Sequence, residues 1–261
     1  MRNMVFNKEE YKSAKYEIID LIKKTHDWEN TEGFIADGVI CPDIYENEKL
    51  KILVVLGESY GFDECEVVDI ECQLEKDILG VGNTNTQTSK KIPILLWLLF
   101  ESLEKNTKLK WDEFPNLLVS NSKNKELLQR TLLKIAWIEV KKASRNIENW
   151  GGDATRQNET EIYNSAFRNK EVLFKQVNSI NPDLMIVCGD SAFNGLCDIE
   201  LFGKEIQKGK KWQIQKNNIG QRIIHVSHPS YLKDWSYEEM YYTFELMFDS
   251  ITNPNSLTSS S

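Results

Sequence analysis

The sequence predicts an α/β protein, a three-layer α/β/α sandwich around a central four-stranded, mostly parallel sheet. Short runs of β-branched and other apolar residues, bounded by polar or turn residues, are typical of buried strands. These runs alternate along the chain with longer helical patterns, as strands and crossover helices do in parallel sheets. We expect a single domain over residues 1–252, followed by a disordered tail at 253–261.

An N-terminal helix over about 7–24 is expected to cover one face of the sheet. The expected strands are KILVVL (51–56), LKIAWIEV (133–140), DLMIVCG (183–189) and RIIHVSH (222–228). The other expected helices cover about 90–105, 124–133, 160–180 and 236–250. After the third strand, Gly189 and Asp190 open one more helix, with Asp190 as its N-cap.

Composition places the chain among ordinary globular proteins. Its 261 residues are 41% hydrophobic and 28% charged, which excludes a disordered chain and a collagen. The net charge is −8, so any DNA contact must come from a local basic patch. The longest apolar stretch, at 92–100, is nine residues long, about half of a membrane span. The N-terminus has no signal-peptide pattern. We therefore expect a cytoplasmic protein with neither a membrane partner nor an obligate protein partner.

The five cysteines favour buried free thiols over metal ligands. Cys65 and Cys72 are seven residues apart, Cys188 and Cys197 are nine apart, and Cys41 stands alone. None of them forms the CxxC pair that zinc and iron–sulfur sites commonly use. We therefore expect neither a metal nor another cofactor.

Two polar motifs follow predicted strands and are expected to meet at one edge of the sheet. The first strand runs into GESYG (57–61), and the last strand runs into HPSYL (228–232). In a parallel sheet both motifs arrive at the carboxyl ends of the strands, where ligands bind. This edge is therefore the predicted functional site.

GESYG also fits the G-x-S-x-G nucleophile elbow of serine hydrolases, with Ser59 as the nucleophile. The candidate bases are His225 and His228, and the candidate acids are Asp183 and Asp190. Against this reading, only about 50 residues precede the motif, and a bulky, acidic segment follows it where an elbow needs small residues. A serine hydrolase or esterase is the alternative interpretation.

The two motifs and the strands that carry them resemble the uracil-DNA glycosylase superfamily, over about residues 51–235. In that superfamily a strand ends in a Gly-containing motif that activates water, and a late strand ends in His-Pro-Ser before a loop that enters the DNA. The resemblance implies a uracil-DNA glycosylase-like fold and a monofunctional DNA glycosylase, which hydrolyses the N-glycosidic bond of a flipped base. Glu58 would orient the attacking water and stabilise the sugar cation. His228 would hold O2 of the departing base.

The chain departs from the superfamily pattern inside the first motif. Ser59 stands where many members have Asp or Asn, and Tyr60 stands where they have Pro. These departures point away from the usual excision of uracil. The iron–sulfur branch of the superfamily shares a Glu after the first Gly but needs four suitably spaced cysteines, which this chain lacks.

Glu139 is the candidate reader of the base. By the same resemblance, it occupies the place near the end of the second strand where uracil-specific members have an Asn. A carboxylate accepts hydrogen bonds and so suits the N4 amino group of cytosine. Because removing ordinary cytosine would be lethal, the expected substrate is a modified cytosine, such as the hydroxymethylated or glucosylated bases of phage DNA. The protein would then act in anti-phage defence.

The remaining candidate residues would contact the flipped base and the DNA. Phe62 would stack on the base beside Tyr60, and residues after His228 would fill the gap that the base leaves. Lysines would meet the phosphates, and the long insert at 63–91 is a candidate lid or binding loop. The candidate DNA contacts are Ser230, Tyr231, Leu232, Lys208, Lys210 and Lys211, with support from Lys204, Lys216, Arg222, Lys141 and Lys142. A catalytically inactive DNA-binding sensor is a third interpretation.

Overall fold

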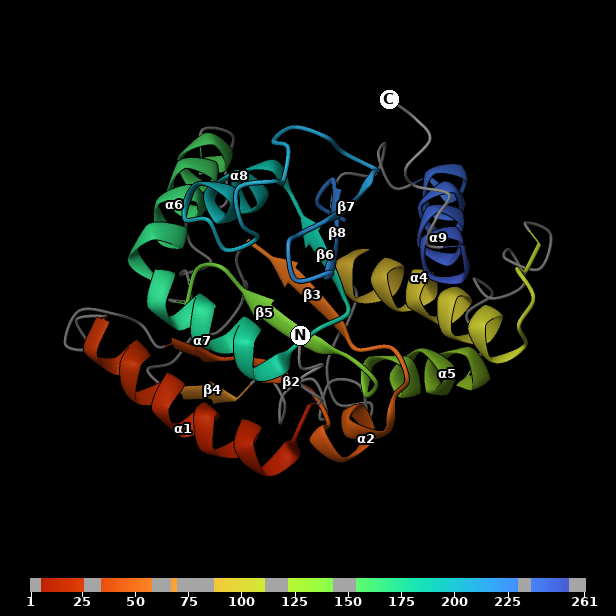
Figure 1. Ribbon diagram of the computed structural model, residues 1–261, viewed down its shortest axis with the longest axis horizontal. Coiled ribbons are helices and arrows are strands. Elements are labelled where there is room, and N and C mark those ends of the chain that lie inside the picture. The colour runs from red at the N-terminus through yellow and green to blue at the C-terminus, as the bar shows by residue number, and fades with distance from the viewer. Residues whose placement is uncertain are drawn as a thin grey trace.

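The computed structural model describes residues 6–25, 34–57, 67–69, 87–110, 122–142, 154–229 and 236–253. Within these ranges the chain is an α/β protein with a mixed six-stranded sheet, in the strand order β2-β5-β3-β6-β8-β7 (Figure 1). Four adjacent strands run parallel: β5 (Ala136–Glu139), β3 (Ile52–Leu56), β6 (Leu184–Cys188) and β8 (Arg222–Val226). They lie within the four segments that the sequence predicts, and the α/β class is confirmed.

Two antiparallel edge strands make the sheet wider than the four strands expected. β2 (Gly38–Val39) pairs with β5, and β7 (Ile214–Lys216) pairs with β8. Neither contains an apolar run of the kind that predicts a strand, so pairing with a neighbour determines their conformation. The expected number of strands is therefore wrong. A separate parallel pair joins β1 (Phe34–Ala36) to β4 (Val67–Asp69), which lies in the insert at 63–91.

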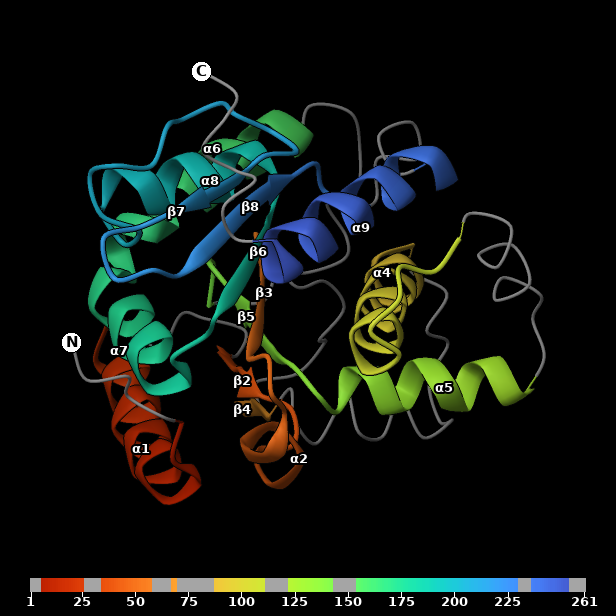
Figure 2. The same cartoon turned by 45° about the vertical axis from the view of Figure 1, so that its right-hand side comes forward.

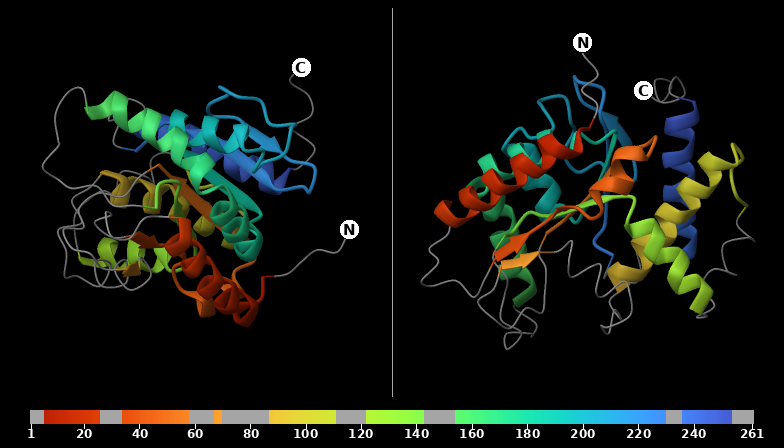
Figure 3. Two further views of the ribbon diagram at one scale, coloured as in Figure 1. Left: turned by 90° about the vertical axis from the view of Figure 1, so that its left-hand side faces the viewer. Right: turned by 90° about the horizontal axis from the view of Figure 1, so that it is seen from below.

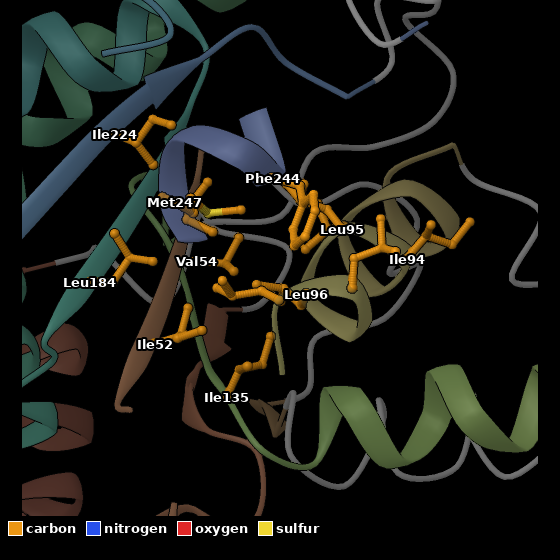
Figure 4. Close-up of a cluster of buried hydrophobic side chains, with 14 of the residues drawn as sticks. Ile52, Val54, Ile94, Leu95, Leu96, Ile135, Leu184, Ile224, Phe244 and Met247 are labelled. Atoms are coloured by element: carbon orange, nitrogen blue, oxygen red, sulfur yellow. The ribbon is translucent and has the colours of Figure 1, made fainter. Parts of the chain in front are cut away.

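Helices cover both faces of the sheet (Figure 2). α4 (Gln87–Glu104), α5 (Ser122–Leu132) and α9 (Tyr237–Thr252) pack on one face, and α6 (Ala154–Arg168), α7 (Lys170–Ile180) and α8 (Asp190–Asp198) pack on the other. Side chains alternate between the two faces along each strand. Val54 therefore enters the first hydrophobic core, on the face that α4, α5 and α9 cover, and Val55 enters the second core, on the face that α6, α7 and α8 cover. Figure 4 shows the first core, where Ile52 and Val54 lie near Leu95 and Leu96 of α4 and Met247 of α9.

The N-terminal helix α1 (Lys8–Thr25) matches the helix predicted over 7–24 and lies along α7. Ile18 and Ile22 pack against Val172 of α7. Near the start of α1, the Tyr11 hydroxyl accepts a hydrogen bond from the backbone N–H of Val39 at 2.7 Å, which joins the helix to β2. The short helix α2 (Pro42–Asn47) follows β2.

The segment 160–180, predicted as one helix, is two helices that meet at Asn169. This side chain is buried, and its Nδ2 donates to the carbonyl oxygen of Val140 at 2.9 Å, just beyond β5. α7 ends at Ile180, and its C-cap Asn181 has a left-handed conformation (φ 46°) before Pro182. The helix break therefore provides a hydrogen bond to the end of a central strand.

The N-cap of α8 lies one residue earlier than predicted. Gly189 is the N-cap, with φ 96°, a conformation that favours glycine. Asp190 is the first helical residue, so its predicted role as N-cap is wrong. α8 lies side by side with α6 (Figure 3), and Gly195 permits this approach: a Cβ there would lie 2.8 Å from Cβ of Ala166.

Candidate functional site

The carboxyl ends of the four parallel strands lie along one edge of the sheet. Leu56 of β3 is opposite Glu139 of β5, and Cys188 of β6 is opposite Val226 of β8. Backbone hydrogen bonds continue past the strand ends, from Lys141 N–H to the Gly57 oxygen (3.0 Å) and from Gly189 N–H to the Val226 oxygen (2.8 Å). We call this edge, defined by Gly57, Glu139, Gly189 and His228, the edge site.

Glu139 is held in a defined orientation at the edge site. It is 2% exposed, and its Oε1 accepts a hydrogen bond from the indole Nε1 of Trp137 at 3.0 Å. Two residues apart on a strand, the two side chains share the face of the sheet that α4 and α9 cover. Burial, and secondarily the Glu139 charge, raise the pKa of the Cys188 thiol, so this thiol stays protonated near the carboxylate.

His228 is half-buried and electrically neutral at pH 7. Burial lowers its imidazole pKa to about 4. Its Cβ lies 3.7 Å from the position that a Cβ on Gly189 would occupy, so the His228 side chain starts next to the end of β6. The next residue, Pro229, accepts a hydrogen bond through its carbonyl oxygen from Lys91 Nζ of α4 at 3.2 Å. Burial lowers the pKa of the Lys91 amine.

Gly57, the first residue of the GESYG motif, directly follows β3 and lies close to α6. A Cβ on Gly57 would lie 2.8 Å from Cδ1 of Ile162, so a larger side chain would require Ile162 to move. The other residues predicted from the two motifs lie outside the described residues: Glu58, Ser59, Tyr60, Phe62, Ser230, Tyr231 and Leu232.

His225 and Asp183 are poorly placed for the hydrolase interpretation. His225 is 1% exposed and its ring stacks on Phe193 of α8, with centroids 4.0 Å apart and planes at 6°. Its Nε2 lies 3.1 Å from Oδ1 of Asp190, and burial lowers the pKa of the imidazole. Asp183 accepts a hydrogen bond from Lys51 N–H at the opposite, amino end of the sheet. Of the two candidate bases, only His228 lies at the edge site.

The predicted phosphate-binding lysines have different surroundings. Lys208 pairs with Asp198, at the end of α8 away from the edge site. Lys211 lies nearer to the site, because its Nζ is 2.9 Å from Oδ1 of Asp190 and 3.4 Å from Oγ of Ser227. Lys210 is exposed.

Lys141 and Lys142 are not available to meet phosphates. The side chain of Lys142 is fully buried and its Nζ lies 2.7 Å from Oδ1 of Asp37, whose side chain is also fully buried. Lys141, with a side chain 6% exposed, pairs with Glu161 at 3.1 Å. The prediction for these two lysines is therefore wrong. The sequence shows two adjacent charges after a strand, a pattern more common on a solvated surface.

Asp37, Gln176 and Asn169 also surround the end of β5, although sequence reasoning did not identify them. Asp37 comes from the turn between β1 and β2, Gln176 from α7 and Asn169 from the junction of α6 and α7. A helical pattern with buried polar positions is the one signal that could have indicated Gln176.

Among the described residues, no helix is long and apolar enough to cross a membrane, and no three His, Cys, Asp or Glu side chains form a group suited to a metal. Three cysteines in these ranges are free thiols: Cys188 is buried, and Cys41 and Cys197 are partly buried. No protein-family model matches the chain, and no curated protein matches it significantly in sequence. The edge site is therefore the only basis for a proposed function.

Proposed function

We propose that the protein is a DNA glycosylase of the uracil-DNA glycosylase fold, which removes a modified cytosine and leaves an abasic site. The observation that carries the proposal is the placement of Glu139 and His228 at one edge, with Gly57 of the GESYG motif directly after β3, a strand that lies between β5 and β8. β5 and β8 are separated by two strands, so their ends are about 14 Å apart. A flipped pyrimidine would lie across the ends of β3 and β6, between Glu139 and His228.

The reaction replaces the bond between the sugar and the base by a bond to water. The water oxygen bonds to C1′ of the sugar while the C1′–N1 bond breaks, and the electron pair of that bond leaves with the base. Glu58, which follows Gly57 in the sequence, would orient the water and stabilise the sugar cation. The water proton is finally taken up by the departing base.

His228 suits the stabilisation of the leaving base. A pKa of about 4 keeps its imidazole neutral at physiological pH, and a neutral imidazole has one N–H that can donate a hydrogen bond. Negative charge develops on O2 of the base as the bond breaks, and a donor already in place there lowers the barrier.

Glu139 supports a cytosine-like substrate. Its Oε1 accepts the Trp137 N–H, which fixes the carboxylate plane, and a carboxylate accepts hydrogen bonds from an amino group such as N4 of cytosine. Uracil has a carbonyl at this position, which is an acceptor and cannot donate a hydrogen bond to the carboxylate. Modified cytosines of phage DNA are the proposed substrates, and anti-phage defence is the proposed role.

The test is an alkali-cleavage assay on matched oligonucleotides containing uracil, cytosine, 5-hydroxymethylcytosine or its glucosylated forms. Cleavage at a modified cytosine, lost in Glu58→Gln and His228→Ala and retained in the exposed-helix control Glu10→Gln, is the expected result. Cleavage at uracil alone would contradict the role of Glu139 but not the glycosylase proposal. If the protein cleaves none of these oligonucleotides, the glycosylase proposal is wrong, and labelling of Ser59 by a fluorophosphonate would then favour the hydrolase.

A further inference from the structure

A buried cluster of hydrogen-bonded polar side chains lies next to the carboxyl end of β5. The Asp37 carboxylate accepts hydrogen bonds from Lys142 Nζ (2.7 and 2.8 Å), from Gln176 Nε2 (2.5 Å) and from the backbone N–H of Glu139. The Asp37 and Lys142 side chains are fully buried. The cluster therefore joins the β5 end to the β1–β2 turn and to α7.

Asp37 replaces a missing strand partner. The antiparallel ladder between β2 and β5 pairs Gly38 with Trp137 and Val39 with Ala136, and Asp37 precedes the first of these pairs. The carboxylate of Asp37 then accepts the N–H of Glu139 in place of a backbone carbonyl. The Glu139 backbone is thus hydrogen-bonded by Asp37, while its carboxylate is hydrogen-bonded by Trp137.

Stability alone is a weak explanation for this ion pair. Removing two charges from water costs about as much as their attraction returns, and apolar residues of similar volume often replace such pairs without loss. The best-attested use of a buried pair is to define one geometry. Here the geometry that it defines is that of the chain at Glu139.

We propose that Asp37 is a positioning residue of the edge site and acts through the backbone of Glu139. Lys142 supplies the counter-charge of Asp37, and Gln176 of α7 donates a hydrogen bond to it. The inference rests on the proposed role of Glu139 in reading the base. Displacing a binding group by about 1 Å can lower a rate about 100-fold. Loss of the Asp37 contact is therefore expected to lower activity on modified cytosine, which Glu139 would bind, more than activity on uracil.

The test uses Asp37→Leu with Lys142→Met, which removes both charges of the pair together and also removes the oxygen that accepts the Glu139 N–H. The matched control is Ser102→Ala, which removes a buried hydrogen bond from Leu109 N–H (3.1 Å) near the other end of α4. The first measurement is the ratio of kcat/KM for modified cytosine to kcat/KM for uracil. We expect this ratio to fall at least about tenfold in the double variant and to stay unchanged in Ser102→Ala.

The second measurement needs no activity. The Trp137 indole N–H, identified among the seven tryptophans by its absence in Trp137→Phe, reports on the Glu139 carboxylate by NMR. Its hydrogen exchange should accelerate at least about tenfold in the double variant and not in Ser102→Ala. An unchanged indole exchange rate would overturn the inference, as would equal losses of activity on both bases.

The two measurements separate the inference from the proposed function. If the wild-type protein cleaves no base, the proposed function fails, while the indole exchange still decides whether Asp37 positions Glu139. If the double variant does not fold, Gln176→Met keeps the ion pair and removes only the hydrogen bonding of Gln176 to Asp37. Faster indole exchange in Gln176→Met would support the inference, and an unchanged rate would contradict it.

Discussion

His228 is expected to remain neutral at pH values where an ordinary histidine is protonated. Burial lowers its pKa from 6.5 to about 4. At pH 6 about 1% of His228 would then be protonated, compared with about three-quarters of a histidine in water. Each pKa unit corresponds to about 1.4 kcal/mol, so the fold makes protonation of this ring about 3 kcal/mol less favourable.

The assay is an NMR titration of the imidazole rings between pH 8 and pH 4. The chain has three histidines, and the His228 signal is assigned by its absence in His228→Gln. We expect the midpoint of His228 near pH 4, and base release, if it depends on the neutral ring, should not change through titration of His228 between pH 5.5 and 8. A His228 midpoint near 6.5 would contradict this prediction, because the ring would then be largely solvated.

The same pKa change predicts a direction for stability against pH. The unfolded chain binds a proton at its normal pKa of 6.5 and the folded chain only near 4, so the stabilisation is complete above pH 6.5 and is lost as the pH falls towards 4. Between pH 7 and pH 5 the contribution of His228 amounts to about 2 kcal/mol. In urea unfolding, the free energy of unfolding of His228→Gln should therefore fall by about 2 kcal/mol less than that of the wild type between pH 7 and pH 5. Equal losses would contradict the prediction.

Three further predictions concern packing and base choice. Gly195→Ala should destabilise the protein by about 1–3 kcal/mol in urea unfolding, although alanine favours helices, because its Cβ would lie 2.8 Å from that of Ala166; a stabilised variant would show that α6 and α8 can separate. Ile186→Ala, at a fully buried position of β6, should cost about 2–5 kcal/mol, and the milder Ile186→Val about 1 kcal/mol. A similar cost for both would argue against a tightly packed site. Glu139→Asn should shift base preference towards uracil in the alkali-cleavage assay, since an amide can donate to a carbonyl. An unchanged preference would remove Glu139 from base reading.

The central strands were predictable because burial on both faces requires a continuous apolar run. β3 and β6 are such runs, and local composition is enough to identify them. The edge strand β2 has two residues, and β7 is half exposed. Their strand conformation comes from hydrogen bonds to β5 and β8, which no local pattern records.

The same distinction applies to the helices. The sequence predicts helix across 160–180 because no Pro or Gly interrupts it. The break at Asn169 depends on a hydrogen bond to Val140, 29 positions earlier in the chain. The predicted capping role of Asp190 is also wrong, because Lys211 and His225 lie within 3.1 Å of its carboxylate in the folded chain.

The amino-acid sequence was enough to predict the α/β class, the positions of the four central strands along the chain, and the arrival of the strands before GESYG and HPSYL at the same edge, because these follow from short-range patterns and the geometry of parallel sheets. Which charges are buried could be seen only in the folded chain. Lys142 looked like a surface lysine, yet its partner Asp37 comes from 105 residues away in the sequence. Whether a charge meets water or a counter-charge depends on which distant segments the fold brings together, and no local pattern contains that information.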